Sequence, residues 1–79
     1  MVADLPKLSE LCVGECAVIN GVHAPDAIRM RLQAMGLRAG KEAEVIRRSR
    51  LGPMQVRIGS VNLIMRRRDA ARISISPQQ

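Results

Sequence analysis

The sequence predicts a mainly β domain with one principal α-helix, folded as a small five-stranded barrel. Three observations favour this fold. The 79 residues are enough for a single domain, residues 1–79, with a small core. Five short segments have the apolar patterning of β-strands, and only one segment has the spacing of a helix. Because a flat five-stranded sheet would leave exposed edges that closure removes, we expect an SH3-like barrel.

The N-terminal segment predicts a turn followed by the first strand. A proline, two leucines and a Gly-Glu pair are typical of a short turn or helical start: Pro6, Leu8, Leu11 and Gly14-Glu15. Residues 16–20 (Cys-Ala-Val-Ile-Asn) then form a compact apolar strand, which we expect Gly21 to end.

The principal helix is predicted to begin around Pro25 and Asp26, because proline is tolerated in a first helical turn and a carboxylate there favours the helix dipole. A single buried stripe follows at the i, i+4, i+7 positions Ile28, Leu32 and Met35. Gly36 is a natural residue after the helix end, and Leu37 would supply the apolar contact of a Schellman motif.

A turn at residues 38–41 leads to the second strand, predicted over residues 42–48. Ala43 and Val45 alternate with Glu42 and Glu44, but Ile46 breaks the alternation, which predicts either a bulge or burial on both sides. Near the C-terminus, residues 69–71 predict one helical turn. Residues 72–75 predict the fifth strand, in which the two isoleucines, Ile73 and Ile75, point inward.

Residues 53–66 carry the clearest signal, a β-hairpin in which two alternating runs flank the loop Gly59-Ser60. Glycine stands first in the loop, as a type II′ turn requires. Ile58 and Val61 then form the closing pair on one face. The register puts four residues on the buried face, Met54, Val56, Leu63 and Met65, and four on the other, Gln55, Arg57, Asn62 and Ile64.

The excess of positive charge lies in the C-terminal half of the chain. The formal net charge is +6, and residues 41–79 hold nine basic and three acidic side chains, whereas the charges of residues 1–40 cancel. Such a field implies an acidic protein surface, an anionic membrane face or a nucleic-acid backbone as partner. The candidate docking arginines are Arg47, Arg48, Arg50, Arg57, Arg66, Arg67 and Arg68. The alternative is a charged face that is merely solvated.

Several classes of function have no support in the sequence. The chain has no Phe, Tyr or Trp on which unstacked bases could stack. No glycine pattern forms a phosphate loop, and no Ser/His/Asp or Cys/His set has a third member, so we expect no enzyme activity. The N-terminus does not resemble a signal peptide, and no apolar run is long enough to span a bilayer. We therefore expect a cytoplasmic protein without direct membrane insertion.

The candidate metal ligands are Cys12, Cys16 and His23, spaced Cys-x₃-Cys-x₆-His. This spacing does not match a structural zinc site, and a fourth ligand would have to come from Glu15, Asp26 or a second molecule. Reduced, small apolar thiols and an exposed loop histidine are the simpler interpretation. We expect no required cofactor, and weak transition metal binding is the alternative.

The ordered motifs of this chain resemble the FeoA family along nearly its whole length. They are Leu8-Ser-Glu-Leu11 with Gly14-Glu15, Arg31-Leu32, Met35-Gly-Leu-Arg-Ala-Gly40, Gly52-Pro-Met-Gln-Val-Arg57 and Asp69-Ala-Ala-Arg-Ile73. The most specific combination joins the Leu-x-x-Met-Gly-Leu-x-x-Gly helix exit to the Gly-Pro hairpin and the Ala-Ala-Arg-Ile ending. Similar domains also end metal-dependent repressors of the DtxR type, but this chain has no helix-turn-helix segment.

The resemblance implies an SH3-like barrel and a cytosolic accessory of bacterial ferrous iron uptake. Such a protein acts on the cytoplasmic region of a FeoB-type transporter, which would hold it peripherally at the inner membrane. Besides the arginines, the helix exit at Leu32, Met35 and Leu37 is a second candidate contact surface. The alternative function is a small basic barrel that binds nucleic acid, which we do not expect because the chain lacks aromatic side chains.

Overall fold

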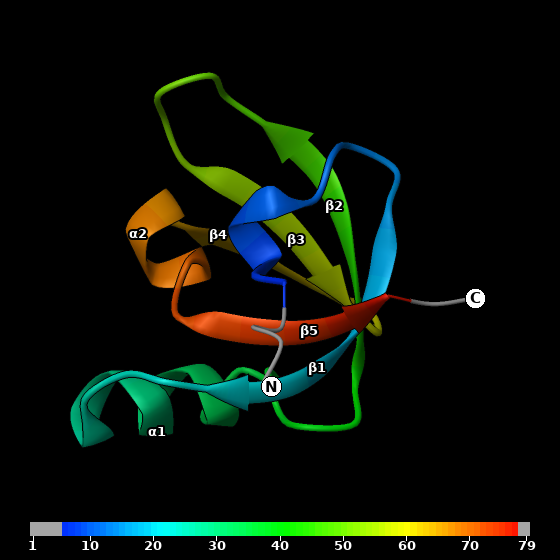
Figure 1. The fold of residues 1–79 in the computed structure, drawn as a ribbon. Coiled ribbons are helices and arrows are strands. Elements are labelled where there is room, and N and C mark those ends of the chain that lie inside the picture. The colour runs from blue at the N-terminus through cyan, green and yellow to red at the C-terminus, as the bar shows by residue number, and fades with distance from the viewer. Residues whose placement is uncertain (1–5, 78–79) are drawn as a thin grey trace, which may run out of the picture.

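The computed structural model describes residues 6–77 as one five-stranded antiparallel sheet with short helical segments around it (Figure 1). The strands are β1 (Cys16–Val22), β2 (Glu42–Arg48), β3 (Met54–Ile58), β4 (Val61–Met65) and β5 (Ile73–Pro77). The helical elements are the 3₁₀ turn η1 (Leu8–Glu10), α1 (Asp26–Ala34) and α2 (Arg67–Ala70). The prediction of a mainly β domain with one principal helix is confirmed.

The sheet is not closed into the predicted barrel. The strand order is β4-β3-β2-β1-β5, so β4 and β5 stand at opposite ends of the sheet and do not pair. The short helix α2 connects these two strands instead (Figure 1). The outer edge of β5 is covered by the N-terminal segment, since Lys7 bridges Ser74 and the Ile75 amide donates to the Pro6 carbonyl at 3.0 Å. No strand or backbone hydrogen bond from residues 6–77 covers the other edge, that of β4.

The hairpin has the predicted register, from Ile58 opposite Val61 to Met54 opposite Met65. Gly59 has a φ of +63° and Ser60 has no positive φ, as a type II′ turn requires. Four of the strand residues predicted to be buried are at most 8% exposed: Met54, Val56, Leu63 and Met65. Val61 is 44% exposed although its partner Ile58 is buried, because Val61 begins an edge strand right after the turn.

Two bulges interrupt the pairing of the sheet. The register between β2 and β3 shifts between Val45 and Arg47, so Ile46 is the extra residue, as the broken alternation indicates. The register between β1 and β5 shifts between Ile19 and Gly21. The prediction that Gly21 ends the first strand is therefore wrong. Pairing of Gly21 with Ser74 on β5 keeps the strand going, because ladder hydrogen bonds outweigh the low strand propensity of glycine.

Helix α1 ends in a complete Schellman motif. The Leu37 amide donates to the Leu32 carbonyl and the Gly36 amide donates to the Gln33 carbonyl, both at 3.0 Å. Gly36 has a φ of +101°, and Leu37 is fully buried. The start differs by one position from the prediction, because Pro25 is the N-cap residue and the helix begins at Asp26.

The buried stripe of α1 is shorter than predicted. Leu32 is buried and Ile28 packs against the core, but Met35 is 42% exposed, because it caps the helix at the margin of the sheet. Helix α2 begins two residues before the predicted turn, with Arg66 as its N-cap, and β5 begins at Ile73.

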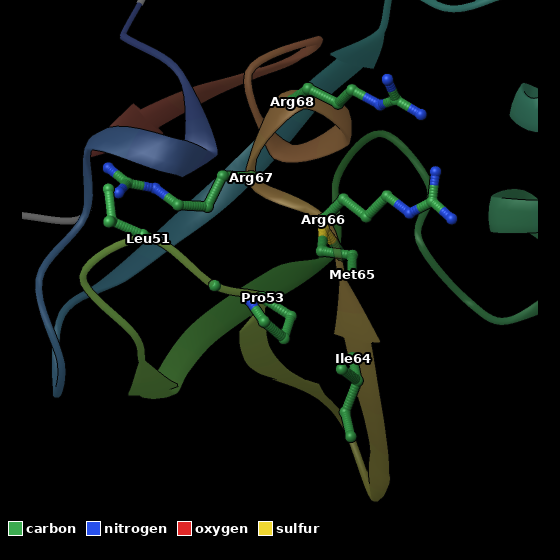
Figure 2. A pocket seen from close by; sticks show the side chains of 8 residues that line it. Leu51, Pro53, Ile64, Met65, Arg66, Arg67 and Arg68 are labelled. Atoms are coloured by element: carbon green, nitrogen blue, oxygen red, sulfur yellow. The ribbon is translucent and has the colours of Figure 1, made fainter.

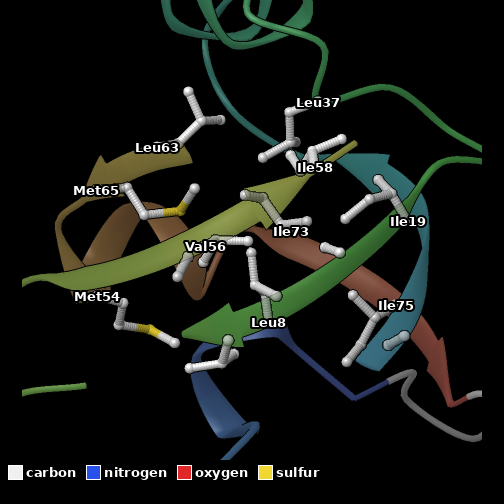
Figure 3. Packing of buried hydrophobic residues seen from close by; sticks show 14 of the residues in the cluster. Leu8, Ile19, Leu37, Met54, Val56, Ile58, Leu63, Met65, Ile73 and Ile75 are labelled. Atoms are coloured by element: carbon white, nitrogen blue, oxygen red, sulfur yellow. The ribbon is translucent and has the colours of Figure 1, made fainter. Parts of the chain in front are cut away.

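Aliphatic side chains alone fill the core (Figure 3). Leu8 comes from η1, Ile19 from β1, Val45 from β2, and both predicted inward residues of β5 are fully buried. In Figure 3, Leu37 points toward Ile58, and both belong to the buried cluster, so the end of α1 packs in the same core as the hairpin. With no aromatic ring available, the core depends on close packing of branched aliphatic residues and methionine.

We expect the Gly36→Ala variant to lose about 1–2 kcal/mol of unfolding free energy, because a Cβ is strained at a positive φ. Nothing lies within 4 Å of the added atom, so the loss isolates the backbone effect. Gly21→Ala is the matched control: its φ is not positive, its Cβ would meet ordinary contacts at 3.6 Å or more, and we expect a change within about 0.5 kcal/mol. Urea unfolding followed by circular dichroism measures both; equal losses would contradict the prediction.

Candidate functional site

The seven candidate docking arginines divide into two groups in the structure. Three of them are engaged within the chain, which the sequence did not indicate. The Arg48 guanidinium donates to the Leu11 carbonyl, Arg57 forms an ion pair with Glu44, and Arg67 donates to the Arg50 carbonyl. These three side chains hold loops and strands together, so they are less free to meet a partner.

The other four arginines present free guanidinium groups. Arg47, Arg50, Arg66 and Arg68 are exposed, and none of them forms a side-chain hydrogen bond or ion pair with any residue between 6 and 77. Arg66 and Arg68 follow β4 directly, at the N-cap and in the first turn of α2. Arg47 lies on β2 opposite Gln55, whereas Arg57 on β3 is paired with Glu44.

An open hollow of about 610 Å³ lies beside these arginines (Figure 2). Its lining is Leu51, Gly52, Pro53, Ile64, Met65 and the arginines 66–68, and no acidic residue belongs to it. We call it the Leu51–Ile64 hollow. Leu51 is 94% exposed and Ile64 is 75% exposed, so both bring a large apolar side chain to the surface of the same hollow.

Figure 2 shows how the three arginines relate to the Leu51–Ile64 hollow. Arg67 reaches toward Leu51, where its guanidinium donates to the backbone of the 49–53 loop. Arg66 and Arg68 extend in the opposite direction, away from Leu51. The hollow therefore combines an apolar surface with exposed positive charge at one end, which suits a ligand that has both apolar and acidic groups.

The prediction of an apolar contact surface at the helix exit is wrong for two of its three residues, because they are buried. Leu32 is 8% exposed and Leu37 is fully buried, so both belong to the core and offer no surface to a partner. Met35 is exposed and is the one residue of this trio that a partner can reach. The Schellman motif explains the difference, because it folds Leu37 back under the end of the helix.

The candidate metal ligands are not brought together. Cys16 begins β1 and His23 follows its end, so the seven residue steps between them, at roughly 3.3 Å each, span about 23 Å. His23 is engaged elsewhere: its Nε2 shares a hydrogen bond of 3.0 Å with the buried Ser74 hydroxyl. Within residues 6–77, no three His, Cys, Asp or Glu side chains gather as metal ligands do. The set Cys12, Cys16 and His23 therefore does not fit a bound transition metal in one chain.

Cys16, at the start of β1, has a thiol whose ionisation is disfavoured by its surroundings. Its partial burial, together with the negative charges of Glu44 and Glu42, raises the pKa of the thiol, while Arg57 acts against this effect. A raised pKa leaves less thiolate at neutral pH, and thiolate is the form that binds metals and reacts. This direction of shift does not favour Cys16 as a metal ligand or a nucleophile.

Sequence reasoning missed the apolar part of the candidate site. One signal was present, since the hairpin register already placed Ile64 on the outward face, where an isoleucine is unexpected. Leu51 is a second signal, because it is a large apolar residue inside a predicted loop.

In the part of the chain that the structure describes, no helix has the length and apolar character needed to cross a membrane.

Comparison with known proteins assigns the family. A family model of the FeoA domain matches residues 7–77. This chain belongs to the FeoA family. Over 70 residues it is 39% identical to the Fe(2+) transport protein A/Fe(2+) transporter FeoB fusion protein of Porphyromonas gingivalis. That match covers 87% of this chain but only 8% of the fusion protein.

Solved FeoA structures have the same fold as this domain. The FeoA protein of Chlorobium tepidum is 37% identical with a TM-score of 0.88, over 94% of this chain and 71% of that one. The zinc complex of Stenotrophomonas maltophilia FeoA, described as an SH3 domain protein, is 30% identical with a TM-score of 0.79, over 90% and 89% of the two chains. The SH3-like prediction is therefore confirmed, although the sheet is open.

The fold is also found in transcriptional repressors. IdeR of T. acidophilum is 18% identical with a TM-score of 0.82, and the match covers 99% of this FeoA domain and 36% of the repressor. At this identity the likeness concerns the fold alone. The match shows that this fold also occurs as one part of a longer chain.

Proposed function

We propose that this FeoA domain is a non-enzymatic docking module that binds the cytosolic region of a FeoB-type transporter and modulates Fe²⁺ uptake. The P. gingivalis relative supports this role, because one polypeptide there carries both transport protein A and the FeoB transporter. The observation that carries the proposal is the Leu51–Ile64 hollow, which is lined both by the exposed apolar side chains of Leu51 and Ile64 and by the exposed residues Arg66 and Arg68.

The combination of apolar and positively charged side chains favours a protein partner over a partner that is bound through charge alone. Protein interfaces have an apolar centre that excludes water and a charged rim that orients the partner. Leu51 and Ile64 would form the centre, and the arginines the rim. We infer a cytosolic domain that is peripheral at the inner membrane only through its transporter, and binding that needs no cofactor.

A titration of ¹⁵N-labelled chain with the cytosolic domain of the FeoB-type transporter from the same organism tests the proposal. We expect amide shifts that cluster around the Leu51–Ile64 hollow and are unchanged by a metal chelator. Duplex DNA of mixed sequence is the parallel arm. If about six arginines neutralised phosphates, raising salt from about 50 to 200 mM would cost on the order of 10³ in affinity for DNA. Shifts with DNA alone would overturn the proposal in favour of nucleic-acid binding.

A further inference from the structure

The open edge of β4 presents backbone groups that nothing else in the described chain uses. Because a two-residue loop joins β3 to β4, the closing pair Ile58 and Val61 is hydrogen-bonded, and the bonded pairs alternate from there. Asn62 and Ile64 therefore direct their N–H and C=O groups outward, away from β3. No backbone hydrogen bond from either residue to another segment occurs between residues 6 and 77.

This edge lacks the features that normally protect a free strand. Natural edge strands carry lysine, proline or other charged residues that prevent further pairing. The whole of β4, Val-Asn-Leu-Ile-Met, has no charged residue and no proline, and Ile64 at its outward face is 75% exposed. The opposite edge of the sheet shows the contrast, because Pro6 and Lys7 cover β5.

The open edge and the Leu51–Ile64 hollow form one continuous surface, because Ile64 belongs to both. We propose that β4 accepts an extended acidic segment of a protein partner as an additional strand. The segment's backbone pairs with Asn62 and Ile64, an apolar side chain enters the hollow between Pro53 and Ile64, and its carboxylates meet Arg66 and Arg68. Backbone pairing supplies affinity in such complexes, and the alternate side chains supply specificity.

The backbone groups at the open edge of β4 indicate which class of molecule can bind there. Outward N–H and C=O groups in strand register pair with another polypeptide backbone, which neither a nucleic acid nor a lipid surface has. A second copy of this chain is disfavoured, because each copy carries a net charge of +6 and the arginines directly after β4 would be brought together. An acidic segment instead neutralises these arginines.

The inference rests on the proposed function only for the identity of the partner. Amide hydrogen exchange by NMR tests it on the native chain with the transporter's cytosolic domain. We expect exchange at Asn62 and Ile64 to slow by about tenfold or more on binding, because both amides gain a partner. Leu63 is the internal control, since its amide already pairs with Val56 and should change little. Binding that leaves the Asn62 and Ile64 amides in fast exchange would overturn strand addition while the proposed function stands.

A proline variant gives an independent test. Ile64→Pro removes an outward N–H without removing a bond to β3, so the hairpin should persist. Ile64→Val keeps the donor and a branched apolar side chain, and is the matched control. We expect affinity to fall roughly fivefold to tenfold for the proline variant and to stay within about twofold for valine. Equal affinities in a folded proline variant would contradict the inference, and if that variant does not fold, the exchange measurement decides.

A synthetic probe separates the two proposals. It is a short peptide in which valine alternates with glutamate, and the same peptide with lysine in place of glutamate is its control. If the transporter domain does not bind but the acidic peptide protects Asn62 and Ile64, the proposed function fails and strand addition stands. If neither ligand protects these amides, or if the lysine peptide binds as well, the inference is overturned. Concentration-dependent self-association through β4 would also overturn it, with a second copy as the occupant.

Discussion

We expect the Leu37→Ala variant to lose about 2–5 kcal/mol of unfolding free energy, the range for truncating a fully buried leucine. A domain of 79 residues has a total stability of only about 4–12 kcal/mol at 0.05–0.15 kcal/mol per residue. The substitution therefore removes a large part of the stability. It takes away the apolar contact that ends α1 and leaves a cavity beside Ile58, where the helix exit meets the hairpin (Figure 3).

Urea unfolding followed by far-ultraviolet circular dichroism measures this loss, because the chain has no aromatic residue for fluorescence. Met35→Ala is the matched control, since Met35 lies two residues away and is exposed. We expect it to cost less than about 1 kcal/mol. Leu37→Met, which conserves volume, should cost under about 1.5 kcal/mol. A Leu37→Ala variant as stable as the native chain would show that Leu37 is a surface residue, as a contact role requires.

The parts of the fold that the sequence predicts are those fixed by local geometry. The hairpin register follows from side-chain alternation and a Gly-Ser loop, and a shift of one residue would expose Val56 and Leu63. The Schellman end follows from Gly36 and Leu37, which lie within five residues of their partners. The bulge at Ile46 follows from a break in a short pattern.

Features that depend on the pairing of segments far apart in the sequence could not be predicted from local patterns. The first strand continues past Gly21 because β5, more than 50 residues later, supplies Ser74 as partner. Barrel closure was expected from the general cost of free edges. In this chain Pro6 and Lys7 cover one edge without closure, and among the described residues nothing pairs with the other edge.

The candidate site shows the same limit. The sequence indicates that seven arginines lie in the basic C-terminal half of the chain. It does not indicate which of their side chains form hydrogen bonds or ion pairs within the chain. Arg48, Arg57 and Arg67 find their partners 37, 13 and 17 residues away in the chain. Charge runs alone carry no information on such pairing. The apolar component depends on Ile64 and Pro53 meeting across the hairpin and its preceding loop.

The second prediction concerns reversal of the positive charges after β4 and its effect on partner binding. The choice of variant depends on Arg67, because its side chain is hydrogen-bonded within the chain. Reversing all three arginines after β4 would also break the hydrogen bond from Arg67 to the Arg50 carbonyl and disturb the loop that carries Leu51. A double variant, Arg66→Glu with Arg68→Glu, changes only side chains that no residue in the described part of the chain engages. It removes two attractions and introduces two repulsions toward an acidic partner.

We expect this double variant to weaken binding to the transporter's cytosolic domain by about ten- to a hundredfold, because each reversed rim charge costs roughly 0.7–1.4 kcal/mol. Arg31→Glu with Lys41→Glu is the matched control: it makes the same change in net charge at two exposed side chains that form no hydrogen bond or ion pair in the described part of the chain and do not line the hollow. Isothermal titration at two salt concentrations measures both. Since surface charges are screened, the difference between the variants should shrink at high salt. Equal losses in the two variants would mean that only the overall positive field attracts the partner, and that the arginines after β4 have no special place in the interface.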